Sequence, residues 1–246
     1  MRIVVIGGTS AIAEHCCRLW VAREACDVVL VARDAAKAER VAQDLRVRSP
    51  ASTITVVEID FLDTKAIGRL ADETAAQPID IVLIAHGMLP GQGPCENDLA
   101  ICRETLDVNA VSPALFAEAF AGHFAKAGRG TIAFIGSVAG DRGRKANYTY
   151  GASKGLVARY AEGLEHRFAG TGVSVVLIKP GPTDTPMAAS HRASGRGRLA
   201  SVEDVARAMV RGIDAKRPVV YAPAQWALIM FVVRHLPRFV FNRLNL

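Results

Sequence analysis

The chain has 246 residues, half of them hydrophobic and 22% charged, and its formal net charge is +6. This length and composition allow a sizeable buried core, which excludes a disordered protein and a small disulfide-stapled scaffold. The cysteines are odd in number and form no C-x-x-C pair, so we expect them to be reduced, as in the cytosol. They are Cys16, Cys17, Cys26, Cys95 and Cys102.

The first predicted element is a buried strand over the apolar run Arg2–Ile6. A turn of small residues follows, Gly7-Gly8-Thr9-Ser10-Ala11-Ile12-Ala13, and opens a helical stretch that continues to Arg23. Small residues let the backbone approach a ligand, and the free N–H groups of a helix N-terminus favour an anion. This segment therefore predicts a phosphate cradle. Glycine ends the apolar run too early for a secretory signal, and none is expected.

Six further strands are predicted, each separated from the next by a helical stretch. They lie near Asp27–Val31, Thr53–Ile59, Asp80–Ile84, Thr131–Ile135, Val173–Ile178 and Val219–Tyr221. Apolar strands with helical crossovers form a parallel sheet that is covered on both faces. The pattern predicts an α/β fold with a Rossmann-like, doubly wound, seven-stranded parallel sheet in three α/β/α layers. We expect residues 1–223 to form one domain and residues 224–246 an apolar helical tail.

A tyrosine and a lysine stand at Y-x-x-x-K spacing in Tyr150-Gly151-Ala152-Ser153-Lys154, and Ser137 lies shortly before them. If a helix begins at Tyr150, Lys154 falls one turn later on the same face. Its ammonium would then stabilise a tyrosinate and lower the phenol pKa from about 10 towards the working range of a general acid. A hydroxyl from Ser137 would hold a carbonyl oxygen as charge builds on it. The alternative is a surface helix along which the lysine extends to water.

Together these segments resemble the short-chain dehydrogenase/reductase family over essentially the whole chain. The family's T-G-x-x-x-G-x-G turn is matched by residues 6–13, where Ala11 and Ala13 replace two glycines. The family's Asn-Asn-Ala-Gly segment is matched only loosely by Ala85-His86-Gly87. Asn109 matches a helix asparagine whose backbone holds a water of the proton relay, and Pro180–Thr185 matches the segment that holds the nicotinamide amide.

The resemblance implies a catalytic tetrad of Asn109, Ser137, Tyr150 and Lys154, and a dinucleotide bound at the C-terminal edge of the sheet. With the phosphate cradle and the end of the second strand, it gives a set of expected cofactor contacts: Gly7, Thr9, Ser10, Ala11, Ile12, Arg33, Asp60, Phe61, Ala85, His86, Gly87, Tyr150, Lys154, Pro180, Gly181, Thr183 and Thr185. The six histidines show no metal-ligand spacing, so no metal site is predicted.

The end of the second strand indicates which dinucleotide is bound. Val31-Ala32-Arg33-Asp34 has no acidic residue at position 32, where an NAD enzyme would hold the ribose 2′-hydroxyl. Arg33 can instead bind a 2′-phosphate. Asp34 is either a helix N-cap or a ribose ligand, and the helical run after it favours the N-cap. The pattern predicts NADP(H) rather than NAD(H).

Basic residues gather at the C-terminal end. From Pro186 to Leu246 there are ten Lys/Arg against three Asp/Glu, a net charge of +7, so the rest of the chain carries −1. No nucleic-acid motif accompanies them, and nucleic acid is not a predicted partner. The tail has an uncharged apolar stretch shorter than the ~20 residues that a spanning helix needs. A helix on an anionic membrane surface is favoured, and a contact with a partner subunit or packing in the core are the alternatives.

The segment Gly140–Gly151 and the tail motif Leu236-Pro237-Arg238-Phe239 resemble a narrower group, the decaprenylphosphoryl-2-keto-β-D-erythro-pentose reductases. This resemblance implies a 2-keto pentose on a polyprenyl phosphate as substrate, made by a partner flavin oxidase. Arg142, Arg144 and Lys145 lie beside the catalytic pair, where guanidinium groups would bind the substrate phosphate. The alternative is a solvated charged loop.

The sequence therefore predicts NADPH-dependent reduction of a keto group, with a lid over the substrate formed by Ser190–Arg198. The family usually forms dimers or tetramers, so a homo-oligomer is expected, in the cytoplasm and peripheral on the inner face of the cell membrane. Three alternatives stay open. They are a soluble ketone or 3-oxoacyl-thioester reductase, a non-catalytic NADP redox sensor, and a membrane scaffold that uses the fold only as a platform.

Overall fold

The computed structural model describes residues 1–188 and 199–244, and the expected lid over residues 190–198 lies outside them. Seven parallel strands form one sheet in the order β3-β2-β1-β4-β5-β6-β7. They are β1 (Arg2–Ile6), β2 (Asp27–Ala32), β3 (Thr53–Glu58), β4 (Ile81–Ile84), β5 (Arg129–Ile135), β6 (Gly172–Pro180) and β7 (Val219–Ala222). The predicted Rossmann-like doubly wound sheet is confirmed, with strand ends that differ by one or two residues.

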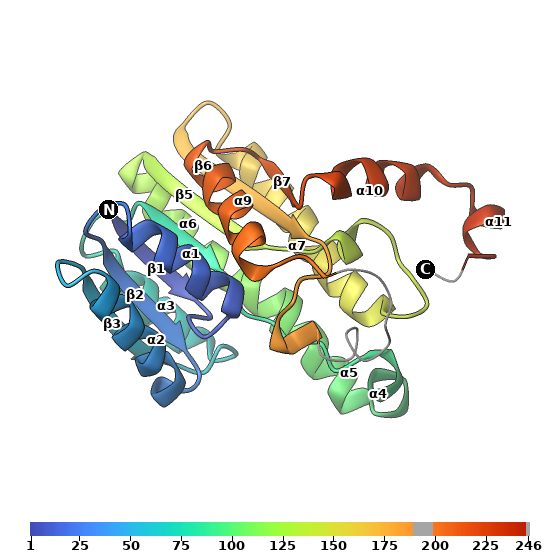
Figure 1. Ribbon diagram of the computed structural model, residues 1–246, viewed down its shortest axis with the longest axis horizontal. Helices are drawn as coiled ribbons and strands as arrows, with labels where there is room; N and C mark the ends of the chain where they lie inside the picture. The colour runs from blue at the N-terminus through green and yellow to red at the C-terminus, as the bar shows by residue number, and fades with distance from the viewer. Residues whose placement is uncertain (189–198, 245–246) are drawn as a thin grey trace.

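Helices cover both faces of the sheet in three layers (Figure 1). One face is covered by α1 (Ala11–Val21), α2 (Ala35–Arg48) and α9 (Val202–Asp214), the other by α3 (Thr64–Thr74), α6 (Ser112–Ala127) and α7 (Tyr148–Arg167). The remaining elements are α4 (Gln92–Asn97), α5 (Leu99–Leu106), the π-helical turn η1 (Asp107–Val111), the 3-10 turns η2 (Val138–Asp141) and η3 (Pro186–Ala188), and the tail helices α10 (Gln225–His235) and α11 (Arg238–Phe241).

The core divides along the two faces of the sheet because successive strand residues point to opposite sides. Ile3 and Val5 of β1 pack with α1, α2 and α9, whereas Val4 and Ile6 pack with α3, α6 and α7. All four side chains are fully buried. Burial on both sides explains why the central strands read as continuous apolar runs rather than as an alternating pattern.

Polar side chains fix where several helices begin. The Asp34 carboxylate accepts a hydrogen bond from the Lys37 N–H at 2.9 Å at the start of α2, and Asp63 does the same for α3 with the Lys65 N–H at 2.8 Å. Such a cap stabilises a helix by about 1 kcal/mol. Asp34 also pairs with the Lys37 ammonium at 3.0 Å. The N-cap interpretation of Asp34 is confirmed.

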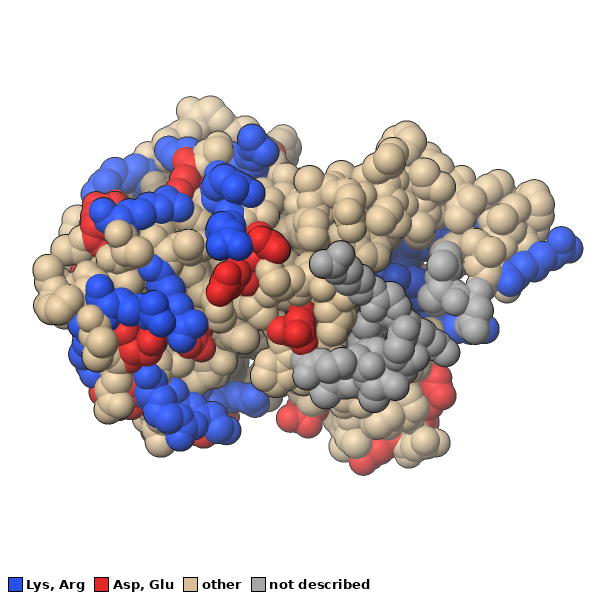
Figure 2. Space-filling view, viewed as in Figure 1, with Lys and Arg blue, Asp and Glu red and all other residues tan. Residues whose placement is uncertain are grey.

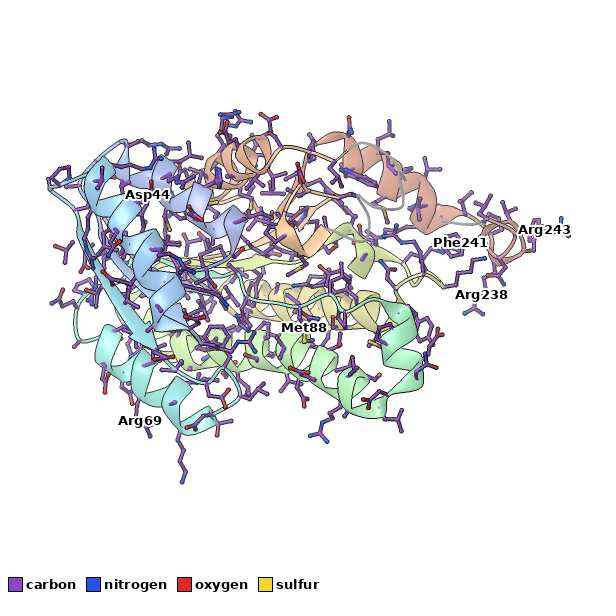
Figure 3. All side chains as sticks on the ribbon, turned by 60° about the horizontal axis from the view of Figure 1, so that its bottom comes forward. Asp44, Arg69, Met88, Arg238, Phe241 and Arg243 are labelled. Atoms are coloured by element: carbon purple, nitrogen blue, oxygen red, sulfur yellow. The ribbon has the colours of Figure 1, made fainter. Side chains whose placement is uncertain are left out.

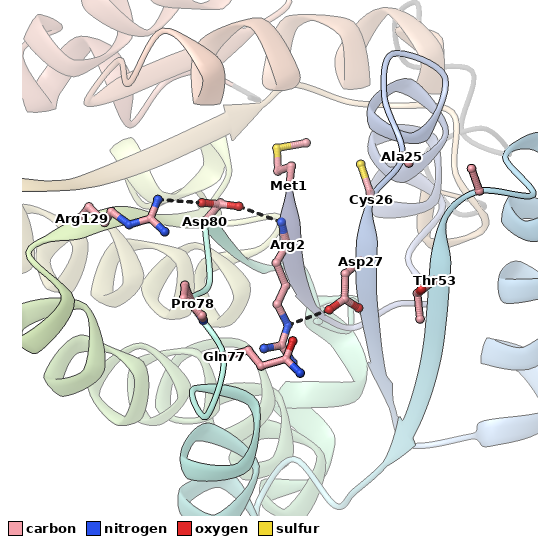
Figure 4. A pocket seen from close by; sticks show the side chains of 11 residues that line it. Met1, Arg2, Ala25, Cys26, Asp27, Thr53, Gln77, Pro78, Asp80 and Arg129 are labelled. Carbon is pink, nitrogen blue, oxygen red and sulfur yellow. Dashed lines mark hydrogen bonds and ion pairs between the residues drawn. The ribbon is translucent and has the colours of Figure 1, made fainter.

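A shallow cavity of about 480 Å³ lies at the amino ends of the strands (Figure 4). Its charged groups form ion pairs with one another. Arg2 pairs with Asp27 at 3.0 Å, and Asp80 accepts from the Arg2 backbone N–H at 2.8 Å and from Arg129 at 3.2 Å. Ligands of doubly wound sheets bind at the opposite, carboxyl edge, so this cavity is not the candidate site.

The tail, residues 225–244, extends from β7 away from the sheet (Figure 1). Met230 anchors it and is 1% exposed, while Leu228 and Phe231 on the outer side are 70% and 62% exposed. Figure 3 shows Phe241 and Arg243 at its outer end. Among the described residues, no helix is both long and apolar enough to cross a membrane.

Candidate active site

The turn after β1 brings backbone close to the neighbouring strand end. Gly7 has a φ of +90°, and a Cβ on it would lie 2.6 Å from the backbone nitrogen of His86. Glycine is therefore required there. The N–H groups of Gly7 and Gly8 both donate to the Val31 carbonyl, at 2.8 and 3.0 Å. Helix α1 then begins without a side-chain cap, which leaves its first N–H groups for an anion.

The ends of β2 and β3 carry the other predicted adenosine contacts. Arg33 is exposed directly after β2, with its guanidinium carbon 5.9 Å from the centre of the Phe61 ring. Asp60 is exposed and accepts from the Leu62 N–H at 2.9 Å. The Phe61 side chain is only 3% exposed and belongs to the core, so its ring is not open to a ligand.

His86 also turns its ring into the core. The ring lies 4.7 Å from the Phe61 ring and 5.5 Å from the Phe116 ring, and its Nε2 is 2.9 Å from the Ser112 hydroxyl. Burial lowers the pKa of His86 to about 3, so the ring is neutral at pH 7. The backbone of Ala85-His86-Gly87, rather than the imidazole, therefore lines the edge of the sheet.

Asn109 lies in the π-helical turn η1 and is fully buried. Its amide accepts from the Met88 N–H at 2.7 Å and donates to the Met88 carbonyl at 2.8 Å, which fixes the side chain against the strand-end loop. A Cβ on Gly87 would lie 2.7 Å from the Asn109 Oδ1 and 3.7 Å from the Lys154 Nζ. Gly87 therefore allows Asn109 and Lys154 to converge. Single π-helical turns occur frequently at functional sites.

Tyr150 and Lys154 stand one turn apart near the start of α7, and the Lys154 Nζ is 5.8 Å from the centre of the Tyr150 ring. Lys154 is 5% exposed and donates to the Ile135 carbonyl at 2.9 Å. Ser137 ends the loop after β5 and caps η2 by accepting from the Ala139 N–H at 3.1 Å. The structure thus brings together all four residues of the expected tetrad.

The electrostatics differ from the expectation for Tyr150. Burial raises the pKa of its phenol, and the nearby Ser137 hydroxyl opposes that rise in part. Burial also lowers the pKa of Lys154 to about 8. The prediction that Lys154 lowers the pKa of Tyr150 is wrong for this structure, because the ammonium is directed to the Ile135 carbonyl and desolvation dominates.

The segment after β6 folds back across the site. The Thr183 hydroxyl is buried and donates to the Gly181 carbonyl at 2.9 Å. A Cβ on Gly181 would lie 2.0 Å from the Trp226 Nε1, so the indole of α10 packs directly on this glycine. Sequence reasoning missed Trp226 because nothing within an apolar tail indicates which residue contacts a distant loop.

The arginine loop, residues 141–147, links η2 to α7 and holds the three expected substrate cations. Arg142 departs from that expectation. Its guanidinium donates to the Val233 and Leu236 carbonyls at 2.5 and 2.7 Å and lies 3.8 Å from the Phe241 ring centre. It is therefore engaged by the tail. Arg144 is half-buried, and its Nε is among the buried polar atoms without a hydrogen-bond partner; Lys145 is exposed.

Comparisons with known proteins agree with this geometry. The family model described as short chain dehydrogenase matches residues 1–195. An uncharacterised oxidoreductase of Streptomyces coelicolor is 32% identical, over 98% of this chain and 95% of its own. A cis-4-hydroxycyclohexanecarboxylate dehydrogenase of Sinomonas cyclohexanicum is 29% identical, over 84% and 86%. A solved short chain dehydrogenase of Burkholderia cenocepacia J2315, in complex with NADP, shares the fold with a TM-score of 0.84 at 21% identity, over 100% and 97%.

Proposed function

The chain belongs to the short-chain dehydrogenase/reductase family, and on that premise we propose that it is an NADPH-dependent reductase of a ketone. The observation that carries this proposal is the convergence of Ser137, Tyr150 and Lys154 at the carboxyl edge of the sheet, beside the glycine turn after β1. In this proposal residues 1–223 form the cofactor-binding domain, and the substrate reaches the active site by way of the tail.

The chemistry follows from the hydroxyl groups and the ammonium. Ser137 holds the ketone oxygen, and Tyr150, which burial keeps protonated at pH 7, donates the proton to that oxygen. The nicotinamide, when bound, supplies the hydride to the carbonyl carbon. In this proposal the Lys154 ammonium passes a proton to the tyrosinate and takes one up from a water held at the Asn109 backbone, so Tyr150 regains the proton it donated. The product is the alcohol.

Replacing Tyr150 tests the reaction. Tyr150→Phe removes the proton donor, so we expect at least a ~100-fold loss of kcat, a typical contribution of general acid catalysis, with unchanged NADPH binding. Tyr148→Phe is the matched control, because Tyr148 stands two residues earlier on α7 and its hydroxyl donates to the exposed Glu96. Turnover that survives in Tyr150→Phe at the level of the control would refute the assigned role.

The residues at the start of the sheet fit a dinucleotide with a 2′-phosphate. A Cβ on Gly7 would fill the cradle, and α1 offers uncapped N–H groups. A cavity of about 390 Å³ beside the cradle is lined by Thr9 and by charged residues of both signs: Glu14, Arg18, Lys37, Arg40 and Asp44. We expect Arg33→Ala to raise the KM for NADPH roughly tenfold, the value of one charge-assisted hydrogen bond, and to change that for NADH little. An equal change in the KM for NADPH and for NADH would contradict the proposal that Arg33 binds the 2′-phosphate.

Arg144 supports a substrate with an anionic group. Among the described residues its buried Nε has no hydrogen-bond partner, and neither has the buried Oδ1 of Asn147, three residues later in the same loop. Burial lowers the pKa of Arg144, and only Asp141 opposes this from nearby. A buried N–H without a hydrogen-bond partner is costly, so we expect an anionic group of the substrate to accept from the Arg144 Nε and a hydroxyl to donate to Asn147. A phosphorylated keto sugar offers both groups.

Two ketones of similar shape test the role of Arg144. The first is 4-oxocyclohexanecarboxylate, suggested by the name of the relative from Sinomonas cyclohexanicum, and the second is cyclohexanone, which lacks the charge. Arg144→Glu should raise the KM for the carboxylate more than ~10-fold, because a charge-assisted hydrogen bond is replaced by repulsion, and leave the neutral ketone nearly unchanged. Similar losses for both ketones would remove the anion site from the proposal.

A polyprenyl-phosphate-linked 2-keto pentose accounts for two features at once. Its phosphate suits Arg144, and its lipid suits the exposed apolar side chains of the tail, which in this proposal meets the inner face of the cell membrane. The first assay is NADPH oxidation by the purified protein with this substrate, generated in place by a partner flavin oxidase. Turnover that requires Tyr150 supports the lipid-linked sugar. Turnover of the carboxylate ketone alone favours the second candidate, a reductase of small anionic ketones.

A further inference from the structure

Arg142 links the arginine loop to the tail. Arg142 donates to carbonyl groups at the C-terminal end of α10, those of Val233 and Leu236, at 2.5 and 2.7 Å. Carbonyl groups in this position have no partner within a helix, so the guanidinium acts as a cap for α10. Its flat face lies 3.8 Å from the centre of the Phe241 ring in α11. One side chain therefore contacts both tail helices.

The arginine loop is in turn fixed to the sheet. Asp141 pairs with the Lys179 ammonium at 2.6 Å and accepts from the Tyr221 hydroxyl at 2.8 Å. The Asp141 and Lys179 side chains are 3% and 6% exposed, so water screens this pair little. Lys179 is next to the last residue of β6, and Tyr221 lies in β7 directly before the tail. The loop thus has two attachments, one to the sheet through Asp141 and one to the tail through Arg142.

The loop also borders the residues assigned to catalysis. It begins four residues after Ser137 and ends three residues before Tyr150, and it carries Arg144, whose buried Nε has no hydrogen-bond partner among the described residues. Movement of the tail would therefore displace the loop on the substrate side of the active site. The glycine turn after β1 and the end of β2 belong to other strands, so cofactor binding should not change.

We propose that Arg142 is a positioning residue that couples the placement of the tail to the substrate side of the active site. Its effect on kinetics rests on the proposed reductase function, whereas its effect on the tail does not. In this role Arg142 holds the loop in place and does not bind the substrate anion. The sequence suggested that Arg142 binds the substrate phosphate. In the structure its guanidinium instead donates to carbonyl groups of the tail and stacks on the Phe241 ring.

Trp226 gives a readout that needs no substrate. The protein has two tryptophans, and Trp20 is 0% exposed in the core, so acrylamide quenching reports mainly on Trp226 in α10. We expect Arg142→Ala to increase quenching because α10 loses the hydrogen bonds at its C-terminal end, although Met230 stays buried. Arg243→Ala is the matched control: it removes the same charge from the exposed end of the tail, where the described residues offer it no hydrogen bond or ion pair. Equal quenching in the two variants would overturn the proposal.

Kinetics separate positioning from substrate binding. A displaced loop should raise the KM for both cyclohexanone and 4-oxocyclohexanecarboxylate roughly threefold or more, with kcat and the Kd for NADPH unchanged, whereas loss of an anion ligand would affect only the carboxylate. The second pattern would overturn the positioning role. If the unmodified protein reduces neither ketone, the proposed function is in doubt, and the quenching comparison still decides the coupling.

A second variant approaches the same contact from the tail. Phe241→Ala removes the stacking face and leaves the arginine loop intact, so it also guards against a folding defect of Arg142→Ala. We expect it to increase Trp226 quenching and to raise the KM in the same direction. An effect of Arg142→Ala without any effect of Phe241→Ala would place the function of Arg142 within the loop and overturn the coupling.

Discussion

Lys154 carries a positive charge that its surroundings stabilise weakly. It is 5% exposed, and the hydrogen-bond partner of its ammonium is the neutral Ile135 carbonyl. Burial lowers its pKa from 10.5 to about 8, so the folded protein releases this proton more readily than the unfolded chain. Below pH 8 the folded state bears the full cost of the buried charge. Between about pH 8 and 10.5 that cost disappears, and this residue's contribution to stability rises with pH.

Lys154→Met should therefore stabilise the ligand-free protein at pH 7. The expected gain in the free energy of unfolding is on the order of 2 kcal/mol. Each pKa unit between the folded and unfolded states corresponds to about 1.36 kcal/mol, and relaxation of the protein around the charge reduces the sum. The gain should shrink as pH rises towards 10.5, since the unmodified protein loses its penalty there. Thermal unfolding of both proteins at pH 7 and pH 10 measures this difference. A variant that is less stable than its parent at pH 7 would contradict the assignment of cost to the charge.

The same lysine should set the alkaline limit of activity. If Lys154 must be charged, kcat/KM for NADPH falls as pH rises through about 8, because the cationic form exists only below that value in the free enzyme. Lys154→Arg keeps its charge across this range, so its activity, although lower, should show no such fall. A pH–rate profile from 6 to 10 for both proteins tests this. Identical alkaline limbs would assign the titration to another group.

At the scale of single elements, the turn between β1 and α1 depends most on one residue type. Gly7 combines a φ of +90° with a neighbour that a Cβ would meet at 2.6 Å. Gly7→Ala should destabilise the protein by at least about 1–2 kcal/mol from backbone strain alone and weaken NADPH binding. Gly122→Ala in α6 is the control: its Cβ meets nothing within 4 Å, and it should stabilise by about 0.5–1 kcal/mol. Urea unfolding and a cofactor titration check both.

The sequence predicted elements better than contacts between them. The seven strands are predictable because strands that are buried on both faces consist of continuous apolar residues. Asp34 is predictable as a cap because the helix follows it directly. Arg142 is not, because its partners lie about 90 residues further along the chain. The burial of the Phe61 ring and the pKa of Tyr150 were not predictable either. Both depend on packed neighbours from distant segments, which no local pattern encodes.

At the scale of the whole molecule, charge and apolar surface coincide at one end. After Asp214 the chain contains no acidic residue but five Lys/Arg, three of them in the tail: Arg234, Arg238 and Arg243. Figure 2 shows basic and acidic residues intermixed over the body and mainly uncharged atoms over α10. A surface that is apolar and cationic complements anionic lipid headgroups above acyl chains. The same surface would also suit a second copy of the chain, as expected for a homo-oligomer.

Vesicle binding separates the two partners. We expect the protein to bind vesicles that contain phosphatidylglycerol more tightly than pure phosphatidylcholine, by about 1 kcal/mol for each tail arginine near the surface, and less tightly at high salt.

Phe231→Ser with Phe239→Ser should weaken binding at least ~10-fold, because the two rings are 62% and 68% exposed and would enter the interface. The oligomeric mass, measured by light scattering, should not change in this double variant if lipid is the partner. A fall in oligomeric mass with unchanged vesicle binding would instead assign the apolar face to a second subunit. In that case the two rings would be buried between copies of the chain and not in lipid.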